Sequence, residues 1–468
     1  MNTLRMKSIF VAASIAAVTV CAAGTPPTVI TALPGPVGLS ATTTNVLYTH
    51  PFCETVAGTR KISTLGGGDF AVLPDQFAGP NQNLTCAENY LATSPGLGGF
   101  PAGVTYVFAV VNQGTASEAR VILREPGGTV FATLPAGFAP VNHAYVSFDT
   151  VGSFGFALLV TGQSGIIGYN SAGGIAFSYT ASLPGAYALE GASVMPLNYV
   201  GCPGCLFVTV SNPGTNGAIL VAAPGASTLS VWTTDAPSEP ESIQFVPFQA
   251  CSFNVNNVGY SYFVSGYNAL SPGTSPASAI LAYTPAQLAP FAGQLLVPDE
   301  FTGIIWAYSG PTTRTVFSNT GYQLEGAQIV QCSPGTGCPA TQGYWKFHTF
   351  PASMFVGGNF TLGTFSYTAT DLVNILETPP KQGNAILILA HQLIAAIANV
   401  DAGAQVTPAA ATAIAQAELL FINNPTLSFA SYLSSSSTLG SQMTTLSNTL
   451  DDYNSAVGLN CSEGSGLQ

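Results

Sequence analysis

Short apolar runs separated by turn residues fill the first two thirds of the chain. Between about residues 40 and 332 these runs are five to seven residues long, rich in β-branched and aromatic side chains, and bounded by Gly, Pro, Asn and Ser. They show no convincing helical period. The pattern therefore predicts an all-β region of about 290 residues, which is longer than a single β-sandwich.

An internal repeat indicates how these strands are arranged. Residues 187–192 (YALEGA) recur as residues 322–327 (YQLEGA), 135 residues later, which corresponds to three units of 45. Residues 241–246 and 142–146 occupy similar places in other units. A period of about 40 to 50 residues with about four short strands is typical of a propeller blade. We predict a β-propeller of about six blades, with five or seven as alternatives and a right-handed β-helix as the second architecture.

A second set of apolar runs keeps step with the repeat and is expected to supply the inner strands. The last two of these runs begin only 25 residues apart, so one unit is either compressed or wrongly assigned. We expect the ring to close through residues 36–50, beside the last blade. The five runs are 120–123, 166–169, 218–221, 279–282 and 304–307.

Beyond Cys332 the pattern changes to helical signals. Asn384 and Thr407 are expected N-caps, the second with Pro408 at the first helical position. Thr370 is expected to cap a shorter helix, and Pro379 follows its end. The expected helices span residues 370–377, 384–400, 409–422 and about 439–453. They predict a small α-rich C-terminal domain, so the protein as a whole is multidomain.

The start of the chain predicts export. A basic beginning, an apolar run and small residues near position 23 are typical of a signal peptide. Val20 precedes Cys21, which argues against a lipid anchor because such sites usually have a small residue there. No later segment is long and apolar enough to span a membrane, so we expect a secreted or cell-envelope protein. The expected units are a signal peptide (1–23), the β-propeller (24–332), a linker (333–337) and the α-rich module (338–468).

Eight cysteines remain when Cys21 is set aside, and an even number in an exported chain predicts disulfides. Eight cysteines allow 105 pairings. Cys202 and Cys205 have the spacing of a thiol oxidoreductase motif, but the apolar run after them predicts a strand, which favours a disulfide-bonded turn. We favour the pairs Cys53–Cys86, Cys202–Cys205, Cys251–Cys332 and Cys338–Cys461, the last of which brackets the α-rich module.

The opening of the α-rich module, CPATQGYWKFH at residues 338–348, resembles a module at the C-terminus of many exported bacterial proteins. The resemblance continues through AHQLIAA (390–396) and LDDYN (450–454), and it covers about a quarter of the chain. Residues 293–308 weakly resemble strands of exported bacterial propellers. The resemblance implies an exported bacterial propeller-like protein with a module of unknown function, and it implies no activity.

Composition excludes several classes of function. Only 6% of the residues are charged, with 9 Lys and Arg against 21 Asp and Glu and a formal net charge of −12. Nucleic-acid binding needs clustered cations, so nucleic acid is excluded as a partner. An aromatic content of 10% excludes disorder. No phosphate-binding loop, nucleophile elbow or dinucleotide fingerprint occurs, so we expect no cofactor other than Ca²⁺.

Three glutamates share one place in the propeller repeat: Glu190, Glu241 and Glu325. We expect them near the central channel, where carboxylates can bind Ca²⁺ or act as an acid–base pair. The alternative is that each glutamate bonds a turn or a neighbouring blade. His143 and Trp306 complete the candidate ligand-binding set.

The α-rich module holds a second candidate site. His348, His391 and Asp451 are ligand types that zinc accepts, if the fold brings them together. The alternative for His391, which has apolar residues one turn away on either side, is a buried histidine bonded to the backbone. Tyr344 and Trp345 fit either the core or a platform that stacks on a sugar.

Three functions are compatible with these patterns. The first is a non-enzymatic surface or extracellular protein whose propeller face binds a protein or a glycan. The second is a propeller hydrolase or lyase that uses the glutamates, and the third is a self-assembling surface subunit. Two glutamates that meet an Asp or His in one cleft would favour the enzyme, and a large exposed apolar patch would favour assembly.

Overall fold

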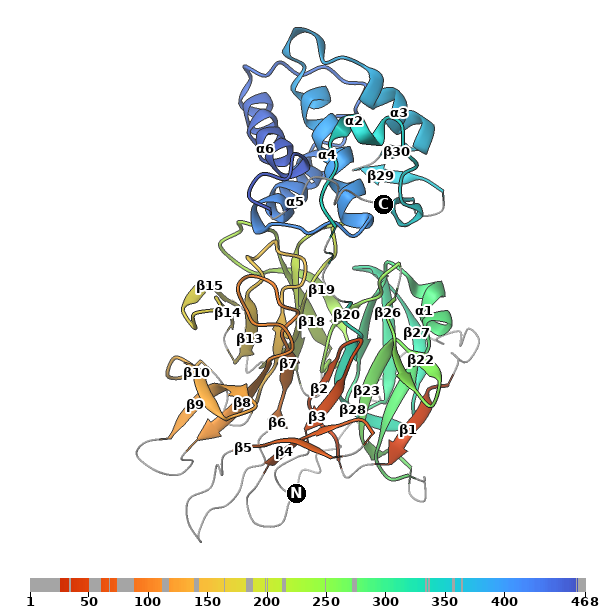
Figure 1. The fold of residues 1–468 in the computed structure, drawn as a ribbon. Helices are drawn as coiled ribbons and strands as arrows, with labels where there is room; N and C mark the ends of the chain where they lie inside the picture. The colour runs from red at the N-terminus through yellow and green to blue at the C-terminus, as the bar shows by residue number, and fades with distance from the viewer. Residues whose placement is uncertain are drawn as a thin grey trace, which may run out of the picture.

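In this computed structural model, the described residues between 26 and 332 form six four-stranded sheets (Figure 1). The residues expected to form the signal peptide, with Cys21, lie outside the part that the structure describes. The structure describes residues 26–32, 35–49, 60–66, 68–73, 88–111, 118–138, 143–163, 165–181, 188–197, 199, 201–212, 216–248, 250–271, 276–332, 335, 337–355, 358–362, 365–459 and 461.

The innermost strands of the six sheets contact one another in a closed ring. A closed ring of four-stranded sheets is a β-propeller, so the chain has the six blades that the repeat predicted. The ring runs through β2 (Leu39–Ala41), β7 (Leu91–Thr93), β12 (Val146–Phe148), β16 (Ala188–Val194), β20 (Gln244–Phe245) and β28 (Tyr322–Ile329), and β28 returns to β2.

Blades 1 to 4 each consist of four strands that follow one another in the sequence. The middle strands are buried because neighbouring blades cover both faces, whereas the outermost strands have exposed positions. Blade 1 adds β3 (Val46–Thr49), β4 (Arg60–Thr64) and β5 (Asp69–Leu73) to β2, and blade 2 adds β8 (Thr105–Val111), β9 (Ala119–Glu125) and β10 (Thr129–Thr133) to β7. Blade 3 adds β13 (Leu158–Gly162), β14 (Gly165–Tyr169) and β15 (Ile175–Thr180), and blade 4 adds β17 (Leu206–Ser211), β18 (Gly217–Ala222) and β19 (Ser230–Ala236).

Blades 5 and 6 exchange strands. After β20 the chain forms β23 (Tyr262–Ala269) and β24 (Ala279–Tyr283), which belong to blade 6, before it completes blade 5. Blade 5 then gains β25 (Leu295–Pro298), β26 (Ile304–Gly310) and β27 (Thr313–Asn319). The outermost strand of blade 6 is β1 (Thr28–Ala32), from the N-terminal end of the described chain. Residues 39–49 do lie beside blade 6, but as the first strands of blade 1.

The five apolar runs expected to be inner strands are third strands instead. They lie in β9, β14, β18, β24 and β26, each of which is third from the channel in its blade. The prediction was wrong because a third strand is also covered on both faces, and is therefore as apolar as an inner strand. The strand exchange explains the short spacing between the last two runs, since β24 and β26 belong to different blades.

Smaller elements complete the β region. Strands β6 (Glu88–Asn89) and β11 (His143–Ala144) form a parallel pair beside the channel. Strands β21 (Phe253–Val255) and β22 (Val258–Tyr260) form a hairpin before β23, and a single helical turn, α1 (Pro285–Leu288), precedes β25.

The C-terminal helical region contains α2 (Gln342–Trp345), α3 (Ala369–Glu377), α4 (Ala385–Asp401), α5 (Pro408–Asn423) and α6 (Thr438–Asn454), with a hairpin of β29 (Phe360–Leu362) and β30 (Phe365–Tyr367). The expected N-caps Asn384 and Thr407 are confirmed, but Thr368 caps α3 instead of Thr370 because Asp371 completes a capping box with it. The other helices pack around α4. None of the described helices is long and apolar enough to cross a membrane.

Three disulfides link described cysteines. Cys202–Cys205, Cys251–Cys332 and Cys338–Cys461 all form as the sequence predicted. The fourth expected pair, Cys53–Cys86, lies outside the described residues. Disulfides persist in oxidising compartments, so the three pairs are compatible with an extracellular protein.

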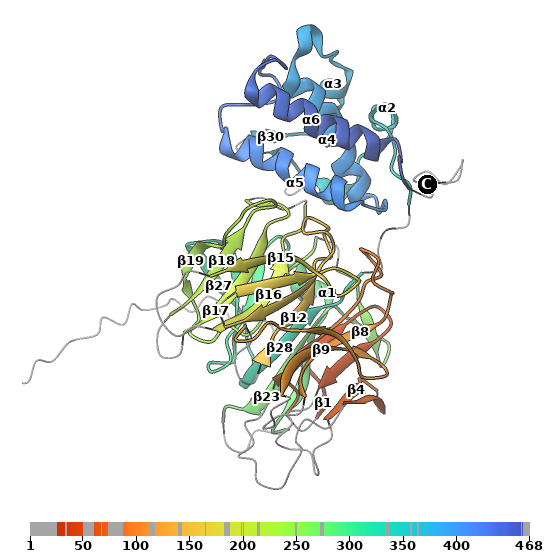
Figure 2. The ribbon, with the colours of Figure 1, turned by 90° about the vertical axis from the view of Figure 1, so that its left-hand side faces the viewer.

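Helix α5 packs against one end of the propeller (Figure 2). Ala411 and Ala415 lie one turn apart and face Gly152 and Gly204, in the loops that follow β12 and β16. A Cβ atom on Gly204 would lie 2.7 Å from that of Ala415, so the close approach requires glycine. Leu197, from the same loop as Gly204, joins the hydrophobic core of the helical region. The two regions therefore share a packed contact over blades 3 and 4.

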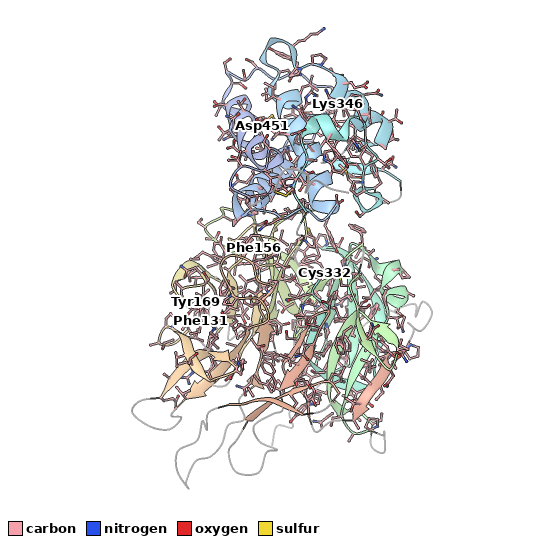
Figure 3. All side chains as sticks on the ribbon, in the orientation of Figure 1. Phe131, Phe156, Tyr169, Cys332, Lys346 and Asp451 are labelled. Atoms are coloured by element: carbon pink, nitrogen blue, oxygen red, sulfur yellow. A yellow bond between two sulfur atoms is a disulfide. The ribbon has the colours of Figure 1, made fainter. Side chains whose placement is uncertain are left out.

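Asp149 organises the first of these loops. Its Oδ1 accepts hydrogen bonds from the backbone N–H groups of Val151 and Gly152 at 2.9 and 2.8 Å. Its Oδ2 accepts from Phe154 and Phe156 at 2.8 and 3.0 Å, and the side chain is fully buried. Figure 3 shows Phe156 at the propeller end nearest the helical region.

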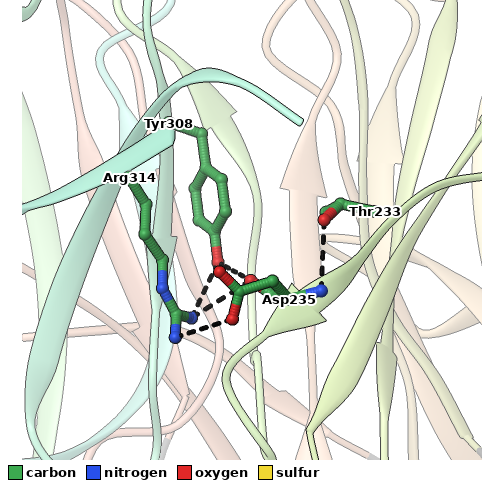
Figure 4. A network of polar contacts seen from close by, with 4 residues as sticks. All are labelled: Thr233, Asp235, Tyr308 and Arg314. Carbon is green, nitrogen blue, oxygen red and sulfur yellow. Dashed lines mark hydrogen bonds and ion pairs between the residues drawn. The ribbon is translucent and has the colours of Figure 1, made fainter. Parts of the chain in front are cut away.

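A second polar contact joins blades 4 and 5 near their edges (Figure 4). The Arg314 guanidinium forms an ion pair with Asp235 at 2.9 Å and donates to the Tyr308 hydroxyl at 3.2 Å. It also lies 4.4 Å from the centre of the Trp306 ring. Asp235 is half exposed, so we expect this ion pair to contribute about 1 kcal/mol at most.

Glu418 on α5 is a carboxyl group buried in the helical region, and none of the described residues donates a hydrogen bond to its Oε2. Burial raises the pKa of Glu418 well above its usual 4.5, and the nearby Asp401 carboxylate raises it further. The folded state therefore favours the neutral form. Below the usual pKa, Glu418 is protonated in both the folded and the unfolded state, so it does not lower the free energy of unfolding. As the pH rises, the carboxyl ionises in the unfolded chain only, and the free energy of unfolding falls.

We expect Glu418→Gln to raise the melting temperature at pH 7.5 and to leave it unchanged at pH 4, because glutamine stays neutral at both values. The measurement is thermal unfolding followed by circular dichroism at both pH values. The matched control is Glu377→Gln, which makes the same change at an exposed position on α3. An equal effect of Glu418→Gln at the two pH values would contradict this account.

Candidate functional site

The three repeat glutamates lie on or beside inner strands, and all three are buried. Glu190 on β16 accepts a hydrogen bond from the Ser211 hydroxyl at 2.9 Å. Glu241, before β20, and Glu325 on β28 both approach the Tyr90 hydroxyl, at 2.6 and 3.2 Å from their Oε2 atoms. The structure therefore brings Glu241 and Glu325 together and leaves Glu190 with a partner in its own blade.

Tyrosine side chains surround this acidic pair. The rings of Tyr90 and Tyr145 lie 5.0 Å apart, and the Tyr145 hydroxyl donates to the Ala327 carbonyl at 3.4 Å. Burial raises the pKa of Tyr145, and the Glu241 carboxylate opposes its ionisation further. These contacts connect blades 2, 3, 5 and 6 across the channel, which supports the bonding of neighbouring blades rather than access to solvent.

The two remaining candidates in the propeller are His143 and Trp306, and the structure places neither side chain beside these glutamates. The backbone of His143 pairs with Glu88 beside the channel, while its side chain lies outside the described part of the structure. Trp306 lies on the third strand of blade 5 and packs against the core between blades 4 and 5.

A cavity of about 300 Å³ opens at the end of the channel that faces the helical region. Five of the six blades contribute to it through the ends of their inner strands and the residues that follow. None of the lining side chains carries a charge. The lining residues are Pro95, Leu97, Ser147, Phe148, Thr150, Ala192, Ser193, Val194, Pro196, Gln244, Phe245, Pro247, Gln328, Ile329, Val330, Gln331 and Cys332.

The amide side chains of this cavity are held in place. Gln244 accepts hydrogen bonds from the Gln328 amide at 3.1 Å and from the backbone of Ile329 at 3.3 Å. Gln244 also lies close to Tyr145, whose pKa it lowers, so it lies between the cavity and the buried tyrosine layer. Cys332 is fixed by its disulfide to Cys251 (Figure 3). The cavity wall is therefore preorganised for a ligand that both donates and accepts hydrogen bonds.

A second cavity of about 260 Å³ lies next to the first, between blades 1 and 2. It shares Pro95, Gln331 and Cys332 with the first cavity. Its lining is also uncharged and contains Thr42, Thr43, Thr44, Asn45, Leu47, Phe70, Thr93, Ser94, Ala102 and Gly103. The glutamates of the channel line neither cavity.

The candidate metal ligands of the helical region are held by separate partners. His348 is exposed, and its ring stacks on Tyr344 with centroids 3.6 Å apart. His391 is buried, and its Nε2 hydrogen-bonds to the Ile375 carbonyl at 2.8 Å. Burial lowers its pKa, although that carbonyl opposes the shift. Asp451 accepts from Gln392 at 2.8 Å.

Among the described residues no group of three or more His, Cys, Asp and Glu is arranged to hold a metal ion. Trp345 of the same region is buried, and its indole N–H donates to Asn399 at 3.0 Å. Tyr344 lies beside it, with ring centroids 5.1 Å apart. For Trp345 the structure supports the core position over the sugar platform.

The chain matches no known protein-family model and no curated protein. Solved structures with a distant likeness exist. One is a nidogen/laminin complex, with 11% identity and a TM-score of 0.34 over 63% of this chain and 85% of that chain. Another is the Dos1 propeller, with 10% identity and a TM-score of 0.31 over 64% and 88%. A third is YCF48 from Cyanidioschyzon merolae, with 12% identity and a TM-score of 0.30 over 67% and 94%.

Sequence reasoning missed the residues that line the two cavities. Gln331 and Ser193 are neutral residues that belong to no known motif, and their spacing in the sequence does not identify them as functional residues. The available signal was positional, because ligands commonly bind where the ends of several elements converge. Both residues lie in or just after an inner strand, close to the glutamates that the repeat did identify.

Proposed function

We propose that this is an extracellular binding protein whose propeller binds a neutral glycan at the mouth of its central channel. The uncharged lining of the 300 Å³ cavity carries the proposal. Sugar hydroxyls need hydrogen-bond donors and acceptors, which the hydroxyl and amide side chains supply, while Phe148 and Phe245 supply apolar ring surface. Ligand pockets usually measure about 300 to 1,000 Å³, so the space suits a small unit.

Two features of the structure argue for a glycan over the other candidate functions. The large apolar side chains that are exposed belong to different blades and loops, so they give little support to a self-assembling surface. Glu190, Glu241 and Glu325 are buried and line neither cavity, so they give little support to a hydrolase acting there. The preorganised neutral cavity supports ligand binding without chemistry.

The test is isothermal titration calorimetry on the full mature protein, with neutral trisaccharides of glucose, mannose and N-acetylglucosamine and with trigalacturonate. We expect saturable binding of at least one neutral sugar and none of the uronate, because the protein is strongly acidic and the lining offers no cation. Absence of neutral-sugar binding, or preference for the uronate, would overturn the proposal.

A variant locates the binding. Ser193→Trp fills the mouth cavity and is expected to weaken binding at least tenfold. Ser230→Trp places the same side chain at an exposed position on the outermost strand of blade 4, and is expected to leave binding unchanged. Equal melting temperatures of the two variants would exclude unfolding as the cause.

A further inference from the structure

The two cavities at the channel mouth are neighbours that share three lining residues. They meet at Gln331, which lines both, with Pro95 and Cys332 beside it. The first cavity lies over the channel, and the second extends outward between blades 1 and 2. A ligand larger than one sugar residue therefore has a second uncharged space next to the first.

Gln331 is fixed at this junction. Its backbone N–H donates to the Ala41 carbonyl at 2.9 Å, and its backbone pairs with Thr42 of blade 1. The next residue, Cys332, is bonded to Cys251. These contacts hold the backbone of Gln331 between the two cavities.

The Gln331 amide has unused hydrogen-bonding capacity. Its Oε1 atom is buried, and no donor among the described residues reaches it. A buried acceptor without a donor is unfavourable, because it has lost its hydrogen bonds to water and gained none from the protein. The atom has almost no accessible surface in this structure, so a ligand hydroxyl at the junction reaches it only when the side chain rotates toward the cavities, and that rotation supplies the missing donor.

The second cavity has the surface that another sugar unit requires. The turn that carries Thr42 and Thr44 is closed by a backbone hydrogen bond from Thr42 to Asn45 and by contacts between the two threonine hydroxyls. Phe70 adds an aromatic ring on the same side. Hydroxyls, the Asn45 and Gln331 amides and one aromatic ring, without a charge, match the chemistry of the first cavity.

We infer that the two cavities are adjacent subsites for neighbouring residues of one neutral oligosaccharide, with the Gln331 amide bonded between them. The inference rests on the proposed glycan-binding function and specifies its ligand class as a chain of at least two sugar units. The mouth cavity holds one unit, and the cavity between blades 1 and 2 holds the next.

The experiment compares ligand length with site-specific obstruction. Calorimetry is performed with mono-, di- and trisaccharides of the glucose, mannose and N-acetylglucosamine series. We expect affinity to rise at least tenfold from the monosaccharide to the disaccharide or trisaccharide. Gln331→Leu, which keeps the size but removes the amide, is expected to weaken trisaccharide binding about tenfold.

Two variants obstruct only the second cavity from different blades: Thr44→Trp on blade 1 and Ala102→Trp on blade 2. Each is expected to reduce trisaccharide affinity to the level of the monosaccharide and to leave monosaccharide binding unchanged. Ser193→Trp is expected to abolish both. Thr44 and Ala102 are both exposed, and the use of two positions keeps the test valid if one variant misfolds.

The outcomes separate the two claims. Monosaccharide binding that Ser193→Trp removes, without a gain from longer chains or an effect of Thr44→Trp and Ala102→Trp, would overturn the second subsite and leave the proposed function intact. Absence of binding by every neutral sugar would overturn both. A length-dependent gain that both obstructing variants remove supports the two-subsite groove.

Discussion

Replacement of Cys338 and Cys461 by serine is expected to lower the free energy of unfolding of the C-terminal helical region by about 5 kcal/mol. The disulfide joins residues 123 apart and closes almost the whole region into one loop, so its loss releases a large conformational entropy in the unfolded chain. Domains are typically stable by only about 5 to 15 kcal/mol, so this loss removes much of the margin.

The measurement is urea unfolding, followed by circular dichroism at 222 nm for α3 to α6 and by tryptophan fluorescence for the propeller, which contains Trp232 and Trp306. The matched control replaces Cys202 and Cys205, which are 3 residues apart. The same loop-entropy relation gives about 2 kcal/mol for that short loop. Equal losses in the two double variants would contradict the loop-length argument.

The second large effect is expected from Asp149→Ala. The carboxylate accepts four backbone hydrogen bonds in a buried loop, and alanine leaves all four N–H groups without that acceptor. We expect a loss of about 4 kcal/mol in the free energy of unfolding of the propeller. The contact between α5 and the propeller should weaken as well, because Gly152 lies in this loop and faces Ala411 on α5.

Chemical denaturation measures the stability loss, and hydrogen exchange of the Gly152, Phe154 and Phe156 amides measures the local opening. Asp235→Ala serves as the control, because it removes a half-exposed aspartate and should cost about 1 kcal/mol at most. Asp149→Asn should fall between the two, since its amide oxygen still accepts. Retained amide protection in Asp149→Ala would refute the role assigned to this side chain.

The sequence allowed much of the fold to be predicted, for identifiable physical reasons. The repeat that contains the glutamates gave the period of the blades, and the structure places these segments on or beside the inner strands of blades 4, 5 and 6. Helix ends were predictable at Asn384 and Thr407 because capping is a local interaction. The three described disulfides could be paired because Cys202 and Cys205 are close in the sequence and because Cys338 and Cys461 lie at the two ends of the helical region. Cys251 and Cys332 were then left as the third pair.

The exchange of β23 and β24 between blades 5 and 6 could not be predicted. Which sheet a buried strand joins depends on long-range pairing, and the apolar pattern of the strand is the same in either blade. Third strands were mistaken for inner strands for the same reason. The repeat period therefore predicted the number of blades, but not which strands belong to each blade.

The candidate site was predicted only in part. Sequence reasoning favoured residues with strong chemistry, and Glu241 and Glu325 do meet, but at a buried tyrosine inside the ring. The open cavities are lined by serine, threonine and glutamine, which are also common in turns and surfaces. Only the three-dimensional convergence of five blades distinguishes Gln331 or Ser193 from the other neutral polar residues.

The low charge of the chain fits this account. A groove that recognises neutral hydroxyl groups gains nothing from ionised side chains, which would have to be desolvated on binding. The few charged residues with described ion pairs, such as Arg314 and Asp235, lie away from the channel mouth. The sparse charge is therefore consistent with the proposed ligand.

The most direct test of the central claim is a crystal structure of the mature protein with the neutral trisaccharide that binds most tightly. We predict electron density for two neighbouring sugar residues across the channel mouth and the cavity between blades 1 and 2, with a ligand hydroxyl within hydrogen-bond distance of Gln331. A trisaccharide bound elsewhere, on the helical region or on an outer strand, with both cavities free of sugar, would contradict the account.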